Sequence, residues 1–267
     1  MIINILLMFV LGLVLGSFYC KIGTRLPLKQ KLFTPSKCES CGHILKYNEK
    51  IPLLSYIFQH GKCNECHQRI PAIYPMFEFI TGVLFVITYI VFKDFYNANL
   101  TILFALSFIS SLLIIMVTDI RYMLIPNKLL LVSTLFTVSL KIILEVKNEV
   151  HKSFMDVGYA LVIMAIYALI MFLIMYIIKK LGELIFRKDA LGGGDVKMMA
   201  FVSAIVGYKL SIVIVFLGSF IALPFSIINS YKKNDALLPF GPYLAIATII
   251  LFLCNVSFDS LLEFINW

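Results

Sequence analysis

Residues 100–119 read LTILFALSFISSLLIIMVTD and carry no charged side chain before Asp119. A helix needs roughly 20 apolar residues to cross the hydrocarbon layer of a membrane, so this stretch predicts a transmembrane helix over 100–118. Further apolar stretches lie at 2–20, 74–92, 124–140, 155–178, 196–207, 211–230 and 241–256. The sequence therefore predicts an all-α polytopic membrane protein with about eight transmembrane helices.

The composition also favours a membrane protein. Of the 267 residues, 61% are hydrophobic and 14% are charged, whereas soluble domains carry about 25% charged residues. A soluble core cannot bury that much apolar surface, so the bilayer must be the solvent for most of the chain. The stretch from Ile2 to Tyr19 has no basic residue before it and no small-residue cleavage site after it. It predicts a retained span rather than a signal peptide.

The segment 196–230 has two interpretations. Gly207-Tyr208-Lys209 predicts a turn, which would divide the segment into two helices, 196–207 and 211–230. The alternative is one kinked or strongly tilted helix. The division is favoured because 35 residues at about 1.5 Å each are far longer than a bilayer is thick.

Lysine and arginine positions predict the orientation in the membrane. The loops 21–71, 119–128, 179–197 and 231–235 hold 18 of the 23 basic residues, and the opposite loops hold five. Because cytoplasmic loops are enriched in Lys and Arg, the first set is predicted to be cytoplasmic and both termini outside. The net charge of +8 is then a signal of topology, and no nucleic-acid partner is expected.

Four cysteines in the polar segment 21–71 form two CxxC pairs. Cys38 and Cys41 make the first pair, Cys63 and Cys66 make the second, and 21 residues separate the pairs. Two such pairs can supply the four thiolates of a tetrahedral Zn²⁺ site. Disulfides or free thiols are the alternative, although a reducing cytoplasm disfavours disulfides. A closed site of four cysteines offers no open coordination position, so the predicted Zn²⁺ is structural.

Two aspartates lie at predicted span ends on the same side of the membrane. Asp119 ends the third span, and Asp195 follows the run Gly192, Gly193 and Gly194 where the sixth span begins. Two close carboxylates can share one proton, so that one activates water while the other protonates a carbonyl. The glycine run would let a substrate backbone approach Asp195. The alternatives are a helix N-cap for Asp195 and an ion pair with Arg121 for Asp119.

At these residues the sequence resembles the prepilin peptidase family, the type 4 leader peptidases. Gly192-Gly193-Gly194-Asp195 fits the GxGD motif of intramembrane aspartic proteases, and Asp119 with Ile125-Pro126-Asn127 resembles the first catalytic segment. The other matching motifs are Gly16-Ser17-Phe18, Arg25-Leu26-Pro27, Ile51-Pro52-Leu53-Leu54-Ser55-Tyr56, Tyr74-Pro75-Met76-Phe77-Glu78 and Leu238-Pro239-Phe240-Gly241-Pro242-Tyr243. The resemblance extends from about Gly12 to Ala245 and includes both CxxC pairs.

The resemblance implies an activity. A membrane aspartic endopeptidase would remove the short basic leader of type IV prepilins and pseudopilins after a glycine, at the cytoplasmic face of a bacterial inner or plasma membrane. Such an enzyme would serve pilus assembly, type II secretion or competence. Many bacterial members also methylate the new N-terminus with S-adenosyl-L-methionine, and Glu78 is the candidate to hold the amine or the methyl donor. Pairing with a loop lysine is the alternative for Glu78.

The expected organisation follows from these assignments. Residues 1–20 form the first span, 21–71 the cysteine-bearing cytoplasmic domain and possible methyltransferase part, 72–257 the aspartic peptidase domain, and 258–267 an external tail. Several residues depart from the family pattern near the N-terminal signatures: Tyr19, Cys20, Glu39, Lys50 and Ile73. The function from another class that remains open is a transporter or channel subunit with a zinc-stabilised loop.

Overall fold

The structure is a computed structural model that describes residues 2–32, 34–148, 154–187, 191–231, 239–256, 258 and 260. In these ranges the chain is helical, and the only β-structure is two isolated bridges, Lys37 to Ile44 and Lys62 to Arg69. The chain packs as two compact units, Met1–Lys93 and Asp94–Trp267. The all-α prediction is confirmed.

The first unit is built on two long helices, α1 (Ile2–Arg25) and α3 (Ile73–Phe92), which pack against each other. A Cβ atom at Gly12 of α1 would lie 2.6 Å from the Cα of Gly82 on α3. Small residues allow this close approach of two apolar helices, as is common in membranes. In the sequence, α1 and α3 are separated by the two cysteine pairs, the 3₁₀ helix η1 (Tyr47–Lys50) and α2 (Leu54–Phe58).

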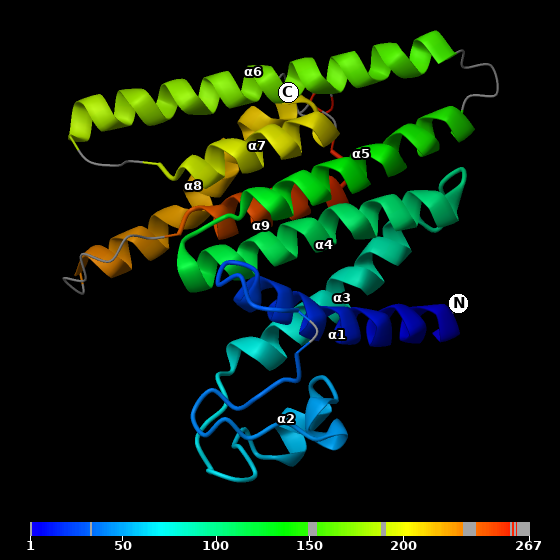
Figure 1. Cartoon of the computed structure of the whole chain (residues 1–267). Helices are drawn as coiled ribbons and strands as arrows, with labels where there is room; N and C mark the ends of the chain where they lie inside the picture. Colours follow the sequence, from blue (N-terminus) through cyan, green and yellow to red (C-terminus); the bar gives the residue numbers. More distant parts are fainter. Residues whose placement is uncertain are drawn as a thin grey trace. The chain divides into compact units, whose positions relative to one another are not determined.

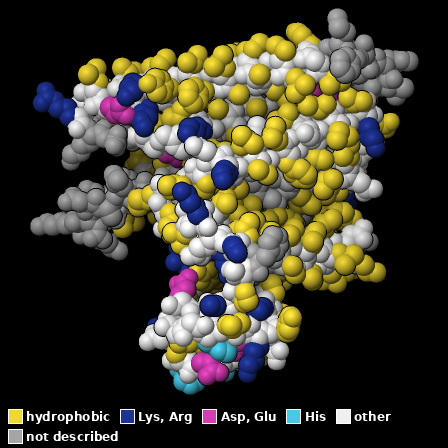
Figure 2. Space-filling model, in the orientation of Figure 1, with side chains coloured by type: hydrophobic (Ala, Val, Ile, Leu, Met, Phe, Trp, Pro, Cys, Tyr) yellow, Lys and Arg dark blue, Asp and Glu magenta, His cyan; other side chains and the backbone are white. Residues whose placement is uncertain are grey.

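The second unit contains six longer helices (Figure 1): α4 (Ala98–Tyr122), α5 (Asn127–Asn148), α6 (Phe154–Phe186), α7 (Gly193–Val206), α8 (Tyr208–Tyr231) and α9 (Gly241–Leu253). Most side chains of α4, α7 and α9 are buried. Helix α9 packs against α4 and α8, while α6 packs against α7. Figure 2 shows hydrophobic side chains over much of the visible face of this unit, on α5 and α6. Such a surface is suited to lipid contact.

Within the described ranges, the helices of the two units other than η1 and α2 coincide with the eight predicted spans. Six are long and apolar enough to cross a membrane: α1, α3, α4, α5, α6 and α8. Helices α7 and α9 have 14 and 13 residues, which is shorter than the roughly 20 residues of a full span. The chain is thus a multi-pass membrane protein whose two shortest core helices are enclosed by longer ones.

The predicted division of 196–230 is confirmed. Helix α7 ends at Val206 and α8 begins at Tyr208, with Gly207 between them at φ +88°. A residue with a Cβ atom rarely adopts such a φ, which explains why glycine stands at this turn. Helix α6 extends beyond the predicted 155–178 to Phe186, because Lys179, Lys180 and Glu183 continue the helix with ion pairs at i, i+3 and i, i+4.

Because α3 packs against α1, it belongs to the compact first unit, which ends at Lys93. The functional boundary predicted at residue 72 precedes this helix and stays a prediction. The predicted tail 258–267 lies outside the described residues apart from Phe258 and Ser260. Leu238 of the late proline-glycine motif also lies outside them.

Candidate active site

Asp119 lies in the last turn of α4. The helix ends at Tyr122, where Met123 adopts a left-handed conformation and donates its N–H to the carbonyl oxygen of Asp119. The Asp119 side chain is 6% exposed, and its Oδ2 accepts a 3.0 Å hydrogen bond from the backbone N–H of Gly241. A buried carboxylate at the end of an apolar helix is thereby held by the start of α9.

Asp195 lies in the first turn of α7. Gly192 occupies the N-cap position without a side-chain cap, and the N–H of Asp195 donates to the Gly192 carbonyl oxygen at 3.2 Å. The side chain of Asp195 is 5% exposed. The alternative that Asp195 is the N-cap residue of this helix is therefore wrong.

The two aspartates meet at Gly241. A Cβ atom on this glycine would lie 2.6 Å from Asp119 Oδ2 and 3.3 Å from Asp195 Oδ1. The two carboxylate oxygens therefore cannot be farther apart than the sum of these distances, although Asp195 lies 76 positions after Asp119 in the sequence. The expectation that they converge at one end of one bundle is confirmed.

The glycine run lies against α6 and against the segment that leads into α5. A Cβ atom on Gly194 would lie 3.0 Å from the Cβ of Ile125, just before α5, and one on Gly193 would lie 3.7 Å from Lys179 Nζ on α6. Lys179 is close enough to Asp195 for a charge–charge interaction. The glycine backbone, which carries no side chains, therefore lies near an apolar residue, a cation and the carboxylates.

A hydrogen bond joins the beginnings of α5 and α7. Lys197, two residues after Asp195, donates from Nζ to Asn127 Oδ1 at 2.8 Å. Asn127 ends the Ile125-Pro126-Asn127 motif that follows Asp119. The two aspartate segments are therefore linked directly, which the sequence pattern did not reveal.

Two buried carboxylates this close cannot both ionise easily, because their charges repel and burial disfavours each charge. They can share one proton, so that one carboxylate accepts a proton from water while the other donates a proton to a carbonyl oxygen. This is the acid–base pair of aspartic peptidases. The observed geometry supplies both groups in one buried place.

In the first unit, the four predicted cysteines also come together. The ligand atoms of Cys38, Cys41, Cys63 and Cys66 lie within 4.8 Å of one another. Each pair forms the same turn. The backbone carbonyl oxygen of Cys38 accepts from the Gly42 N–H, and that of Cys63 accepts from the His67 N–H. The Sγ atoms of Cys38 and Cys66 are 3.8 Å apart, much longer than a disulfide bond, and all four are free thiols. The cluster can bind a metal ion.

The cluster also has the electrostatics of a cation site. Hydrogen bonds from the backbone N–H groups of Cys41 and Ser40 lower the pKa of the Cys38 thiol to about 6. The backbone N–H of His43 lowers the pKa of Cys41, but burial and the three neighbouring thiols outweigh it and raise that pKa to about 12. Four thiols so close cannot all lose their protons unless a cation binds, and Zn²⁺ suits four thiolates.

Glu49 joins the two cysteine turns. Its carboxylate accepts hydrogen bonds from the Lys46 N–H at 2.7 Å and from Asn64 Nδ2 at 2.6 Å, and it contacts His43 Nε2 at 3.1 Å. The Lys46 N–H is the main reason why the pKa of Glu49 is lowered. His43, which lies close to the cysteines in the sequence, thus contacts the Glu49 carboxylate.

Glu78 does not contact the cysteines. It lies near the start of α3, is 9% exposed, and accepts the Leu53 N–H on Oε2 at 2.7 Å and a hydrogen bond from the Ser17 hydroxyl. Leu53 has φ 60° and ψ −50°, and the Leu54 N–H donates to the Pro52 carbonyl oxygen. This is a γ-turn in a strained backbone conformation. Glu78 therefore holds a strained turn of the loop beside α1.

Comparison with known proteins assigns this arrangement to a family. Residues 10–92 match the bacterial peptidase A24 N-terminal domain, and residues 106–227 match the type IV leader peptidase family. The chain belongs to the type IV leader peptidase family and is a membrane peptidase.

The relatives agree in name, and two of the three match over nearly their whole length. The chain is 32% identical over 262 residues to a prepilin leader peptidase/N-methyltransferase of Bacillus subtilis, covering 97% of this chain and 96% of the relative. It is 27% identical over 260 residues to one of Vibrio cholerae, covering 94% and 96%. A third, from Dichelobacter nodosus, is 29% identical over 230 residues, covering 86% and 74%. No solved structure matches. These comparisons give no support to the transporter or channel alternative.

Proposed function

We propose that the chain is an aspartic endopeptidase that removes the leader of type IV prepilins and pseudopilins after a glycine, with Asp119 and Asp195 as its catalytic residues. The observation that carries the proposal is that both buried carboxylates lie against Gly241. The names of the relatives support the substrate class. Because Asp119 lies at the end of the apolar helix α4 and Asp195 at the start of the apolar helix α7, cleavage would take place where an apolar membrane segment of the substrate meets its polar leader.

The proposed reaction needs only the carboxylate pair and water. One carboxylate takes a proton from water as the water oxygen attacks the carbonyl carbon of the scissile bond, and the other gives its proton to the carbonyl oxygen. As the C–N bond breaks, the carboxyl group that took the proton from water gives it to the leaving amine, and the other carboxylate regains a proton from a hydroxyl of the tetrahedral intermediate. Gly192, Gly193 and Gly194 leave room for the substrate backbone beside Asp195, because no side chain projects from them.

The location of the reaction is proposed from the distribution of charges. The basic loops indicate a cytoplasmic site in a bacterial inner or plasma membrane, with both termini outside. Residues 72–257 then carry the peptidase, residues 1–20 the first span, residues 21–71 the cytoplasmic cysteine-bearing part, and residues 258–267 an external tail.

The cysteine cluster is proposed to hold a structural Zn²⁺ through Cys38, Cys41, Cys63 and Cys66. Four thiolates close the tetrahedron, so the ion would stabilise the loop and take no part in hydrolysis. The matching turns around Cys38 and Cys63 and the link through Glu49 support a structural role for the ion. The ion would supply folding energy to a polar segment with little apolar core.

Methylation of the new N-terminus is proposed as a second activity, because the relatives are named as N-methyltransferases. S-adenosyl-L-methionine would supply the methyl group. Glu78 is the proposed site for the amine: a carboxylate has about four acceptor positions, and the Leu53 N–H and the Ser17 hydroxyl use two of them. A protonated amine could therefore still bind there.

The test uses full-length protein and a purified prepilin in detergent or vesicles. Asp119→Asn and Asp195→Asn should each abolish cleavage while the protein still folds, whereas Asp156→Asn should cleave normally, because this exposed aspartate lies in the first turn of α6. The mass of the processed N-terminus reports methylation separately. Cleavage by either active-site variant would remove that residue from the mechanism.

A further inference from the structure

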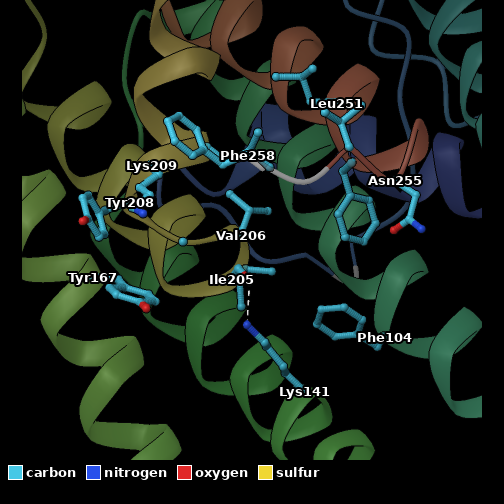
Figure 3. Close-up of a pocket in the computed structure, with 14 residues that line it drawn as sticks. Phe104, Lys141, Tyr167, Ile205, Val206, Tyr208, Lys209, Leu251, Asn255 and Phe258 are labelled. Atoms are coloured by element: carbon cyan, nitrogen blue, oxygen red, sulfur yellow. Dashed lines mark hydrogen bonds between the residues drawn. The ribbon is translucent and has the colours of Figure 1, made fainter. Parts of the chain in front are cut away.

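A cavity of about 470 Å³ lies in the second unit, at the other end of the helices that carry the active-site residues (Figure 3). Helices α4, α7 and α9 contribute residues of their far ends to its lining, among them Phe104, Ile205 and Leu251. Asp195 and Ile205 are ten residues apart on α7, which corresponds to about 15 Å. The cavity is therefore separate from the active site.

Lys141 brings a positive charge into this cavity from α5. It is half-buried, and its Nζ donates a 2.6 Å hydrogen bond to the Ile205 carbonyl oxygen, which Figure 3 marks as a dashed line. Within the described residues this oxygen is its one hydrogen-bond acceptor, and no carboxylate lies within ion-pair distance. An ammonium group has three N–H donors. Lys141 therefore has donors left for an anion.

Lys209 adds a second cation. It is exposed near the start of α8, and its Nζ lies 5.4 Å from the centre of the Phe258 ring. Of the described residues that line the cavity, none is Asp or Glu, although Glu145, four residues after Lys141 on α5, interacts with the Lys141 charge from outside the lining. Tyr167 and Tyr208 lie on one side with ring centres 5.4 Å apart, and Phe104 lies on another (Figure 3). The lining thus combines two cations with a wall of aromatic and aliphatic side chains.

We propose that this cavity binds the phosphate headgroup of an anionic phospholipid. Lys141 and Lys209 would contact the phosphate, and the acyl chains would lie along the wall of aromatic and aliphatic side chains. The charge distribution puts Lys141 and Lys209 on the side opposite the cytoplasm, where a lysine ammonium group can contact a headgroup phosphate, and Tyr side chains gather where helices leave the hydrocarbon. The wall explains the choice of a lipid over free phosphate, which has no apolar part to bury. The proposal is independent of the proposed peptidase activity.

The test is lipid binding to the full-length protein, measured by native mass spectrometry in neutral detergent. Dioctanoyl phosphatidylglycerol should bind about tenfold more tightly than dioctanoyl phosphatidylcholine, and Lys141→Met should weaken it about tenfold, because a charge-assisted hydrogen bond is lost. Lys209→Gln should weaken it about threefold, since exposed charges contribute less. Lys141→Arg should retain binding.

Lys147→Gln is the matched control, because Lys147 is exposed near the same end of α5 and does not line the cavity. It should leave the affinity unchanged. Should Lys141→Met fail to fold, Lys209→Gln and Lys141→Arg still decide the matter. Equal binding of the two lipids, or unchanged binding in the lysine variants, would overturn the proposal. Inorganic phosphate that binds as tightly as phosphatidylglycerol would overturn the assignment to a lipid.

Discussion

The backbone N–H of Gly241 donates a hydrogen bond to Asp119 across 122 residues of sequence. The same glycine faces Asp195, so its missing side chain leaves the space in which the two carboxylates meet. A Cβ atom closer than about 3 Å to an oxygen requires a shift of one of the two groups. Gly241 therefore sets how closely α9 approaches the carboxylate pair.

Gly241→Ala should lower the kcat/KM of leader cleavage about 100-fold, because a displacement of about 1 Å at a reacting group can cost that much. The added methyl group would lie 2.6 Å from Asp119 Oδ2 and would push the carboxylate away from Asp195. A cleavage assay on the purified protein measures the effect, and the thermal unfolding midpoint shows whether the fold is intact.

Gly158→Ala is the control for this substitution. Gly158 lies in α6, and no atom would lie within 4 Å of an added Cβ. Alanine should be neutral or slightly stabilising there, since it favours helix over glycine. If Gly241→Ala were as active as Gly158→Ala, the role of Gly241 in spacing the carboxylates would be refuted.

The link between Lys197 and Asn127 should contribute to activity as a pair. Lys197→Met and Asn127→Leu each remove the 2.8 Å hydrogen bond between the starts of α7 and α5. Each should lower kcat about tenfold, and the double variant should be no worse than about tenfold, because residues in direct contact are not additive. The control is Lys180→Met, an exposed lysine on α6 that pairs with Glu183. Additive effects in the double variant would show that the two residues act separately.

Local pattern was enough to predict the spans, the turn at Gly207 and the cysteine cluster. Each depends on residues near one another in sequence: an apolar run, a glycine at positive φ, or a pair of cysteines at short spacing. The glycine run that precedes Asp195 and the apolar run that ends at Asp119 are local patterns too, and together they predict the acidic pair.

Contacts between distant segments could not be predicted in this way. Neither the hydrogen bond from Gly241 to Asp119 nor that from Lys141 to Ile205 has a local signature, because each depends on how whole helices pack. The hydrogen bond from the Leu53 N–H to Glu78 was not predicted for the same reason. Leucine rarely adopts a positive φ, so its identity gives no signal for the strained turn at this position. The late motif around Gly241 was the one available signal for the third member of the site.

Metal content gives a direct test of the cysteine cluster. Protein purified without chelator should contain about one zinc ion per chain, and Cys38→Ser with Cys66→Ser should lose it, since a structural site needs all four ligands. Cys254→Ser should keep the metal, because Cys254 is exposed and lies outside the cluster. Elemental analysis measures the ratio. Wild-type protein without zinc, or with disulfides among these cysteines, would contradict the assignment.

Glu78 offers a substitution that separates its charge from its role as a hydrogen-bond acceptor. Glu78→Ala leaves the Leu53 N–H without its acceptor, which costs at least about 1 kcal/mol. Hydrogen exchange around residues 51–56 should then become roughly tenfold faster. Glu78→Gln keeps an acceptor oxygen, so the turn should stay protected. Glu39→Ala is the control, because Glu39 accepts from the Tyr74 hydroxyl, whereas the Leu53 N–H donates to Glu78.

The same pair of variants tests methylation by the mass of the processed pilin N-terminus. If the charge of Glu78 holds the incoming amine, Glu78→Gln should abolish the added methyl group and leave leader cleavage intact, although its turn remains protected. An amide carries no charge to balance an ammonium group, and this loss is what distinguishes binding from support of the loop. Full methylation by Glu78→Gln, together with rapid exchange and lost methylation in Glu78→Ala, would assign Glu78 to the turn at Leu53 alone.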